Sequence, residues 1–100
     1  MPSEVPGQEL VEAGLAALEQ GEWTVEALLV AVGAPRLRLI GLRVPELRDA
    51  PEHPELALYQ ALGRIYPDDA YSRYNALIRR LVSYEQEMER RKYASPAPSR

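Results

Sequence analysis

The residues that could do chemistry are few in this chain of 100 residues, and their spacing predicts no catalytic site. The sequence has no cysteine, which excludes a thiol nucleophile, a disulfide and any cysteine-bound metal. Its only histidine, His53, lies among prolines in an expected connector, where no serine is placed to use it as a base. Ser72 and Ser83 fall in the middle of an expected helix. We therefore expect no catalytic residue.

Carboxylates are numerous, but their pattern favours neither acid–base chemistry nor a metal site. Glutamates three residues apart on expected helix faces lack the further ligands that a metal ion needs. These pairs are Glu9 with Glu12 and Glu19 with Glu22. The adjacent Asp68 and Asp69 are explained by a helix N-cap and by an i,i+4 pair with Arg73. The six glycines fit no phosphate-binding motif, so we expect no metal and no cofactor.

One segment, residues 24–43, could form a helix-turn-helix, a motif that places its second helix in the major groove of DNA. Gly33 stands where the motif needs its turn, and Arg36, Arg38 and Arg43 lie in or beside the second helix. However, six glutamates and no basic residue precede the first arginine, and the net charge of −3 lacks the basic footprint of phosphate binding. We keep DNA-binding regulation as the alternative function, with these three arginines as its contacts, and do not expect nucleic acid as the partner.

These residues would be positioned by helices, because apolar residues recur at helical spacing along most of the chain. We predict an all-α single domain of four to five helices over residues 8–93, with a flexible arm at 1–7 and a disordered tail at 94–100. The expected helices cover residues 8–20, 24–32, 35–42, 54–65 and 68–93. Gly14 lies inside the first of them, at a cost of about 1 kcal/mol relative to alanine, which indicates a close approach by another backbone.

The second expected helix, 24–32, is apolar on nearly every side, which predicts a place at the centre of the fold. Thr24 would cap its start and Gly33 would end it. The next segment is ambiguous. Pro35 suits the first turn of a short helix, whereas residues 36–44 begin with an arginine–leucine alternation typical of an edge strand. We favour the helix, since no other segment has the pattern of a partner strand, and leave the alternative open.

The last expected helix carries a heptad seam of apolar residues that continues beyond the core. The seam consists of Tyr74, Leu77, Leu81, Tyr84 and Met88. At about 1.5 Å per residue, the range 68–93 is roughly 39 Å long, whereas a spherical chain of this size is about 33 Å across. We therefore expect the last two turns to project and the seam to pair with a second copy of the chain.

The composition predicts a role in protein assembly. Six tyrosines replace phenylalanine entirely, and tyrosine and arginine are common at interfaces because they combine apolar area with a polar end. No apolar run approaches the roughly 18 residues of a membrane span, and the N-terminal sequence lacks the regions of a secretory signal. We predict a small cytoplasmic, non-catalytic interaction or assembly module that forms a homodimer through its C-terminal helix and does not bind membranes. We leave open a further protein partner, which the sequence does not identify.

Overall fold

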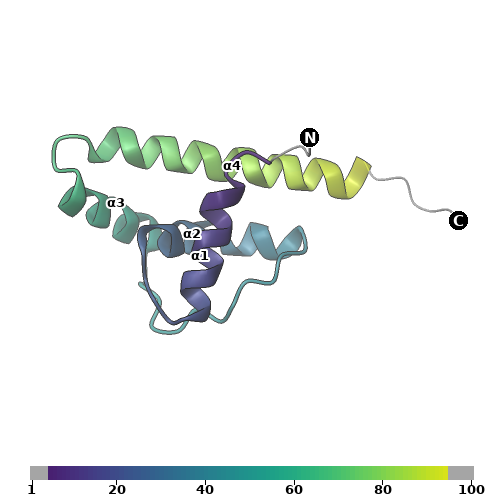
Figure 1. Cartoon of the computed structure of the whole chain (residues 1–100), viewed down its shortest axis with the longest axis horizontal. Helices are drawn as coiled ribbons and strands as arrows, with labels where there is room; N and C mark the ends of the chain where they lie inside the picture. The colour runs from purple at the N-terminus through teal and green to yellow at the C-terminus, as the bar shows by residue number, and fades with distance from the viewer. Residues whose placement is uncertain (1–4, 95–100) are drawn as a thin grey trace, which may run out of the picture.

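The structure of the protein, a computed structural model, describes residues 5–94 and folds them into four α-helices. The helices are α1 (Gln8–Glu19), α2 (Val25–Leu39), α3 (Pro54–Ile65) and α4 (Ala70–Ala94), and residues 5–94 contain no strand. Figure 1 shows α4 along the length of the molecule, α2 and α3 below it, and α1 running across α2. The predicted all-α fold is confirmed, with four helices. The first four residues and residues 95–100, parts of the predicted arm and tail, lie outside the described residues.

Helices α1 and α2 pack closely because Gly14 leaves no side chain at their contact. A Cβ atom at this position would collide with the carbonyl oxygen of Glu26 and with the side chain of Val30. The close backbone approach predicted from Gly14 is therefore confirmed. Helix α1 also reaches α4, where Glu9 Oε2 accepts a hydrogen bond from Arg80 Nη2 at 2.7 Å.

Helix α2 is one helix where the sequence predicted a helix, a turn and a further element. Thr24 caps its start as expected, because Thr24 Oγ1 accepts a hydrogen bond from the backbone N–H of Ala27 at 3.0 Å. The turn predicted at Gly33 is wrong, because the helix continues through Pro35 to Leu39. Both assignments of the following segment, as a separate short helix and as an edge strand, are wrong for the same reason.

Packing explains why α2 continues past the proline. Gly33 lies where α2 touches α4, since a Cβ atom there would be 2.7 Å from Glu85 Oε2 and 3.0 Å from Leu81 Cδ2. The glycine therefore permits a close contact and does not end the helix. Beyond it, Leu37 is fully buried, which stabilises the last turns although the proline lacks the N–H of a regular helical residue. The chain leaves the helix at Gly41, whose φ of 101° favours glycine.

The core is centred on α2, which contacts the three other helices. The central position predicted for the apolar segment 24–32 is therefore confirmed. The largest fully buried side chains are Val11, Leu29, Val30, Leu37, Leu58 and Leu62. The connector between α2 and α3 closes one end of this core, and Trp23 Nε1 fixes it by donating a hydrogen bond to the carbonyl oxygen of Arg48 at 3.1 Å.

Residues 5–7, which the sequence assigned to a flexible arm, lie against the helices. Val5 is buried in the core, and Gly7 is so close to α4 that a Cβ atom would be 2.7 Å from the carbonyl oxygen of Arg80. The described part of the predicted arm is thus packed against α4, because an apolar side chain and a glycine fit there.

The molecule is elongated, with principal extents of 52 × 27 × 23 Å. The spherical shape assumed from chain length is therefore wrong, and the second half of α4 has room to lie along the end of α2. Two polar contacts join these segments. Arg36 forms an ion pair with Glu89, and Lys92 Nζ donates a hydrogen bond to the carbonyl oxygen of Leu39 at 2.9 Å. The helix end that was expected to project is attached to α2 as far as Lys92.

Candidate functional site

The predicted self-association seam packs against the core of a single chain. Leu81 is 3% exposed and Tyr84 is 5% exposed. Tyr74, Leu77 and Met88 are partly buried and pack against the same core. The expected exposure of Tyr84 is wrong because the long α2 and the segment before α1 cover this side of α4. Self-association itself stays a prediction, and Leu81 and Tyr84 are too buried to contribute much surface to it.

The arginines of the predicted DNA-binding segment do not form a helix-turn-helix surface. Arg36 and Arg38 lie on the single helix α2, and Arg43 lies in the connector after it. Arg36 pairs with Glu89, and Arg38 Nη2 donates a hydrogen bond to the carbonyl oxygen of Pro45 at 3.4 Å. Because the motif requires a second helix that leaves the first at a turn, this segment lacks the geometry on which the alternative function was based.

A different flank of α4 exposes uncharged residues. Tyr71, Asn75, Ile78 and Val82 follow one another at spacings of four, three and four residues, so they share one side of the helix. Tyr71 is 69% exposed and Val82 is 41% exposed. The sequence does carry a signal for this flank, because the apolar arc of α4 is wider than one packing contact needs. The seam predicted from the sequence does not include these residues.

Helix α3 extends this uncharged surface. The rings of Tyr59 and Tyr74 meet edge to face with their centroids 5.8 Å apart, which joins the surfaces of the two helices. Nothing lies within 4 Å of a Cβ atom built at Gly63, so an approaching helix has free access there. We call this surface the hairpin face: Leu56, Tyr59, Gly63, Tyr71, Asn75, Ile78 and Val82.

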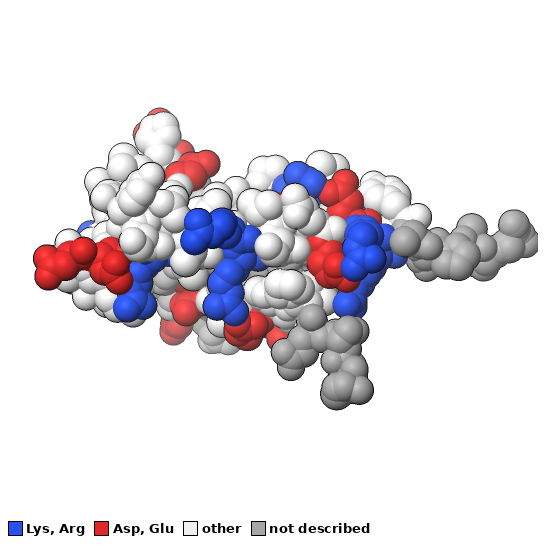
Figure 2. Space-filling model, turned by 90° about the horizontal axis from the view of Figure 1, so that it is seen from above, with Lys and Arg blue, Asp and Glu red and all other residues white. Residues whose placement is uncertain are grey.

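Exposed hydrophobic side chains are concentrated on the hairpin face. Seven large hydrophobic residues are exposed within residues 5–94, and four of them belong to it. These four are Leu56, Tyr59, Tyr71 and Val82. In the view onto α4, charged side chains gather in separate groups, with uncharged surface between them (Figure 2). The hairpin face is therefore the main apolar surface that the described chain leaves open.

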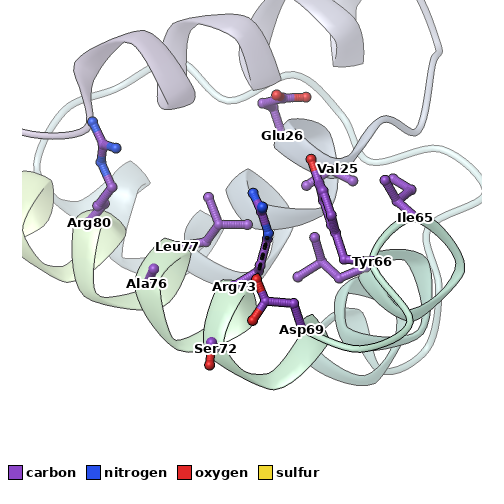
Figure 3. Close-up of a pocket in the computed structure, with 11 residues that line it drawn as sticks. Val25, Glu26, Ile65, Tyr66, Asp69, Ser72, Arg73, Ala76, Leu77 and Arg80 are labelled. Carbon is purple, nitrogen blue, oxygen red and sulfur yellow. Dashed lines mark hydrogen bonds and ion pairs between the residues drawn. The ribbon is translucent and has the colours of Figure 1, made fainter.

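A groove of about 630 Å³ lies between the start of α2, the end of α3 and the first half of α4 (Figure 3). Its apolar lining includes Val25, Leu62, Ile65, Ala76 and Leu77. Its charged lining consists of Glu26, Asp69, Arg73 and Arg80, so the two signs balance. By helical position, the groove residues of α4 occupy nearly the opposite flank from the hairpin face.

Two contacts orient the side chain of Arg73 in the groove. Arg73 Nε lies 3.2 Å from Asp69 Oδ2, to which it donates a hydrogen bond, so the i,i+4 pair predicted from the sequence is confirmed. The guanidinium carbon lies 3.8 Å from the centroid of the Tyr66 ring, in a cation–π contact. The two contacts together fix the plane of the guanidinium group. The sequence did not predict that Tyr66 would take part.

The contact between α2 and α4 contains a buried carboxylate. Glu85 is 7% exposed and lies against Gly33. Burial raises the pKa of Glu85, and the charge of Arg36 lowers that pKa by less than burial raises it. Two residues later, by contrast, hydrogen bonds from Arg91 and Arg90 lower the pKa of the partly buried Glu87. One end of α4 therefore holds two glutamates whose pKa values shift in opposite directions.

Between residues 5 and 94, no three His, Cys, Asp or Glu residues come together in a way that could hold a metal ion. Over the same residues, no helix combines the length and the apolar character that crossing a membrane requires.

Comparison with known proteins adds no relative. No protein-family model matches the chain, and neither a curated protein nor a solved structure is significantly similar to it. The function has to be inferred from the hairpin face and the groove.

Proposed function

We propose that this protein is a small helical assembly module that forms a homodimer through the hairpin face. The observation that supports the proposal is the concentration of four of the seven exposed large hydrophobic side chains on one uncharged surface. Contiguous apolar surface of this kind is typical of protein interfaces. Each large apolar side chain that becomes fully buried contributes about 1.5–3 kcal/mol, which favours association.

A second copy of the chain fits this face better than a charged partner does. The face carries no charge, so two copies do not repel each other there and no oppositely charged surface is required. Tyrosine and asparagine supply hydrogen-bonding groups beside apolar area, as interfaces commonly do. Two α3–α4 hairpins related by a two-fold axis would form a four-helix arrangement, in which Gly63 permits close approach.

The proposal is tested by light scattering of the purified full chain at micromolar concentration. We expect a mass of about twice the chain mass of 11.2 kDa. The double variant Tyr71→Glu, Val82→Glu should have the mass of a single chain, because two charges would have to be buried at the interface. The control is Leu39→Glu, which changes an exposed leucine outside the hairpin face and should leave the dimer intact.

Two results would contradict the homodimer. A native mass of 11.2 kDa would exclude it at the concentration used. A dimer that persists in the double variant but dissociates in Leu39→Glu would move the interface to the end of α2. Circular dichroism of each variant establishes that the helices remain folded.

A further inference from the structure

The groove contains an arginine whose side chain is held in place but whose hydrogen-bonding groups are only partly paired. Of the guanidinium nitrogens of Arg73, only Nε has a hydrogen-bond partner within residues 5–94, namely Asp69. Figure 3 shows the terminal nitrogens pointing into the groove, beside Leu77 and the ring of Tyr66. A guanidinium group presents its terminal N–H groups as a planar fork that matches a carboxylate or a phosphate. Because its plane is already fixed, less side-chain freedom is lost on binding.

The start of α2 adds positive potential at the rim of the same groove. The helix begins at Val25, and the N-terminus of a helix carries a partial positive charge. Thr24 Oγ1 accepts only the N–H of Ala27, and the first N–H groups of a helix have no partner within the helix. An anion bound near Arg73 would therefore be favoured by two separate features of the fold.

The walls of the groove restrict what can carry the anion. Leu62, Ile65 and Leu77 give the groove an apolar lining, and its volume lies within the range of ligand pockets, about 300–1,000 Å³. Glu26 lies across the groove from Arg73 (Figure 3) and repels a second negative charge. A phosphate dianion is therefore disfavoured. A single carboxylate attached to an apolar group fits both the walls and the charge.

We propose that this groove binds a monocarboxylate carried on an apolar body, with Arg73 as the residue that binds the carboxylate. Two sources share this chemistry: a small organic acid, and a peptide segment in which an acidic residue adjoins apolar side chains. The groove and the hairpin face occupy nearly opposite flanks of α4. The ligand site therefore does not depend on the proposed homodimer.

Nuclear magnetic resonance titration of the ¹⁵N-labelled full chain tests this site, with hexanoate as the probe. We expect hexanoate to shift the Nε–H signal of Arg73 and the backbone amide signals of Ala76 and Leu77. Hexanamide and hexyl phosphate, which have apolar bodies of the same length, should bind more weakly. Arg73→Gln should lower the affinity for hexanoate on the order of 10- to 100-fold, as expected for losing hydrogen bonds to a charged group.

A matched control lies on the same helix. Arg79 is exposed and does not line the groove, so Arg79→Gln should leave hexanoate binding unchanged. Arg73→Lys, which keeps the charge but loses the planar fork, should bind with intermediate affinity. Equal binding of hexanoate and hexanamide would overturn the proposal, and so would unchanged binding by Arg73→Gln. The spectrum of each variant shows directly whether it is folded.

A second titration distinguishes the two sources of the carboxylate. Its probe is a blocked peptide with two leucines before a glutamate, and its control has glutamine in place of the glutamate. Tighter binding of the glutamate peptide than of hexanoate supports a protein segment as the ligand. The reverse order supports a small organic acid. Equal binding of the glutamate and glutamine peptides overturns the peptide as ligand.

Discussion

Along α4, residues 70–82 and residues 83–94 meet different surroundings. The first stretch leaves Tyr71 and Val82 exposed on one flank and places Arg73 in a groove on the other. The second stretch buries Tyr84 and is attached to the end of α2. Both candidate interaction surfaces therefore lie on the first stretch, which is the more apolar of the two.

The difference between the two stretches arises from the length of α2. Fifteen residues of helix span about 22 Å. Because α2 continues past Pro35, it reaches the second half of α4 and covers it, whereas the shorter α3 leaves part of the first half open. A turn at Gly33 would have left Tyr84 without this cover. The wrong predictions of a turn at Gly33 and of a projecting end of α4 therefore have a single cause.

Removing a core side chain from the far end of α2 should have the largest effect. Leu37 is fully buried beyond the proline, so we expect Leu37→Ala to lower the free energy of unfolding by about 2–5 kcal/mol. Leu39 is exposed two residues later, and Leu39→Ala should change that free energy by less than about 0.5 kcal/mol. Urea unfolding followed by circular dichroism measures both. Similar small effects would mean that the end of α2 does not pack as described.

Two glycine substitutions should have smaller effects on the free energy of unfolding, and these effects should be opposite in sign. We expect Gly33→Ala to lower the free energy of unfolding by about 1–2 kcal/mol, because the new methyl group would press on the buried Leu81 and Glu85. Gly63 faces open space on a helix, so Gly63→Ala should raise the free energy by about 0.5–1 kcal/mol. The same urea unfolding experiment measures the free energy of unfolding of both variants. Stabilisation by Gly33→Ala would contradict a close contact between α2 and α4 at this point.

A smaller effect, dependent on pH, is expected from Glu85. Because its pKa is raised in the folded protein, the folded state holds this proton more tightly than the unfolded chain does. The contribution of Glu85 to stability is thus fully present below the ordinary pKa of glutamate and is lost as the pH rises through the raised pKa. We expect Glu85→Gln to match the native chain in acid and to melt at a higher temperature at neutral pH.

Glu87 supplies the control for this pH dependence. Its pKa is lowered by Arg91 and Arg90, so its contribution is present above the ordinary pKa of glutamate and is lost as the pH falls through the lowered pKa. Glu87→Gln should therefore melt at a lower temperature at neutral pH, the opposite of Glu85→Gln. Thermal melts from acidic to neutral pH measure both variants. A shift in the same direction for both would contradict the different surroundings of the two carboxylates.

Much of the fold could be predicted because its boundary signals are local. Gly21 follows α1, Pro54 begins α3 and Thr24 caps α2, and each acts through its own backbone or side chain. Gly33 could not be interpreted in the same way. A glycine that ends a helix and a glycine that admits a neighbouring helix are identical in sequence, and only the neighbour distinguishes them.

The candidate sites were less predictable than the helices. The Asp69–Arg73 pair follows from spacing alone, but Tyr66 and Val25 reach the groove only because separate helices meet there. The seam on α4 faces the core at Leu81, as the pattern indicates. A pattern on one helix does not say whether the covering partner is the same chain or another. That is why the predicted interface was placed on residues that the chain itself covers.

The contacts between α2 and the end of α4 also have a consequence for synthesis on the ribosome. Arg36 and Glu89 are 53 positions apart, as are Leu39 and Lys92. At about 5–20 residues added per second, the partners at the end of α4 are made roughly 3–10 seconds after the end of α2. During that interval the last turns of α2, which include Pro35, have no α4 to pack against. We expect the last part of α2 to become stably helical only when translation is nearly complete.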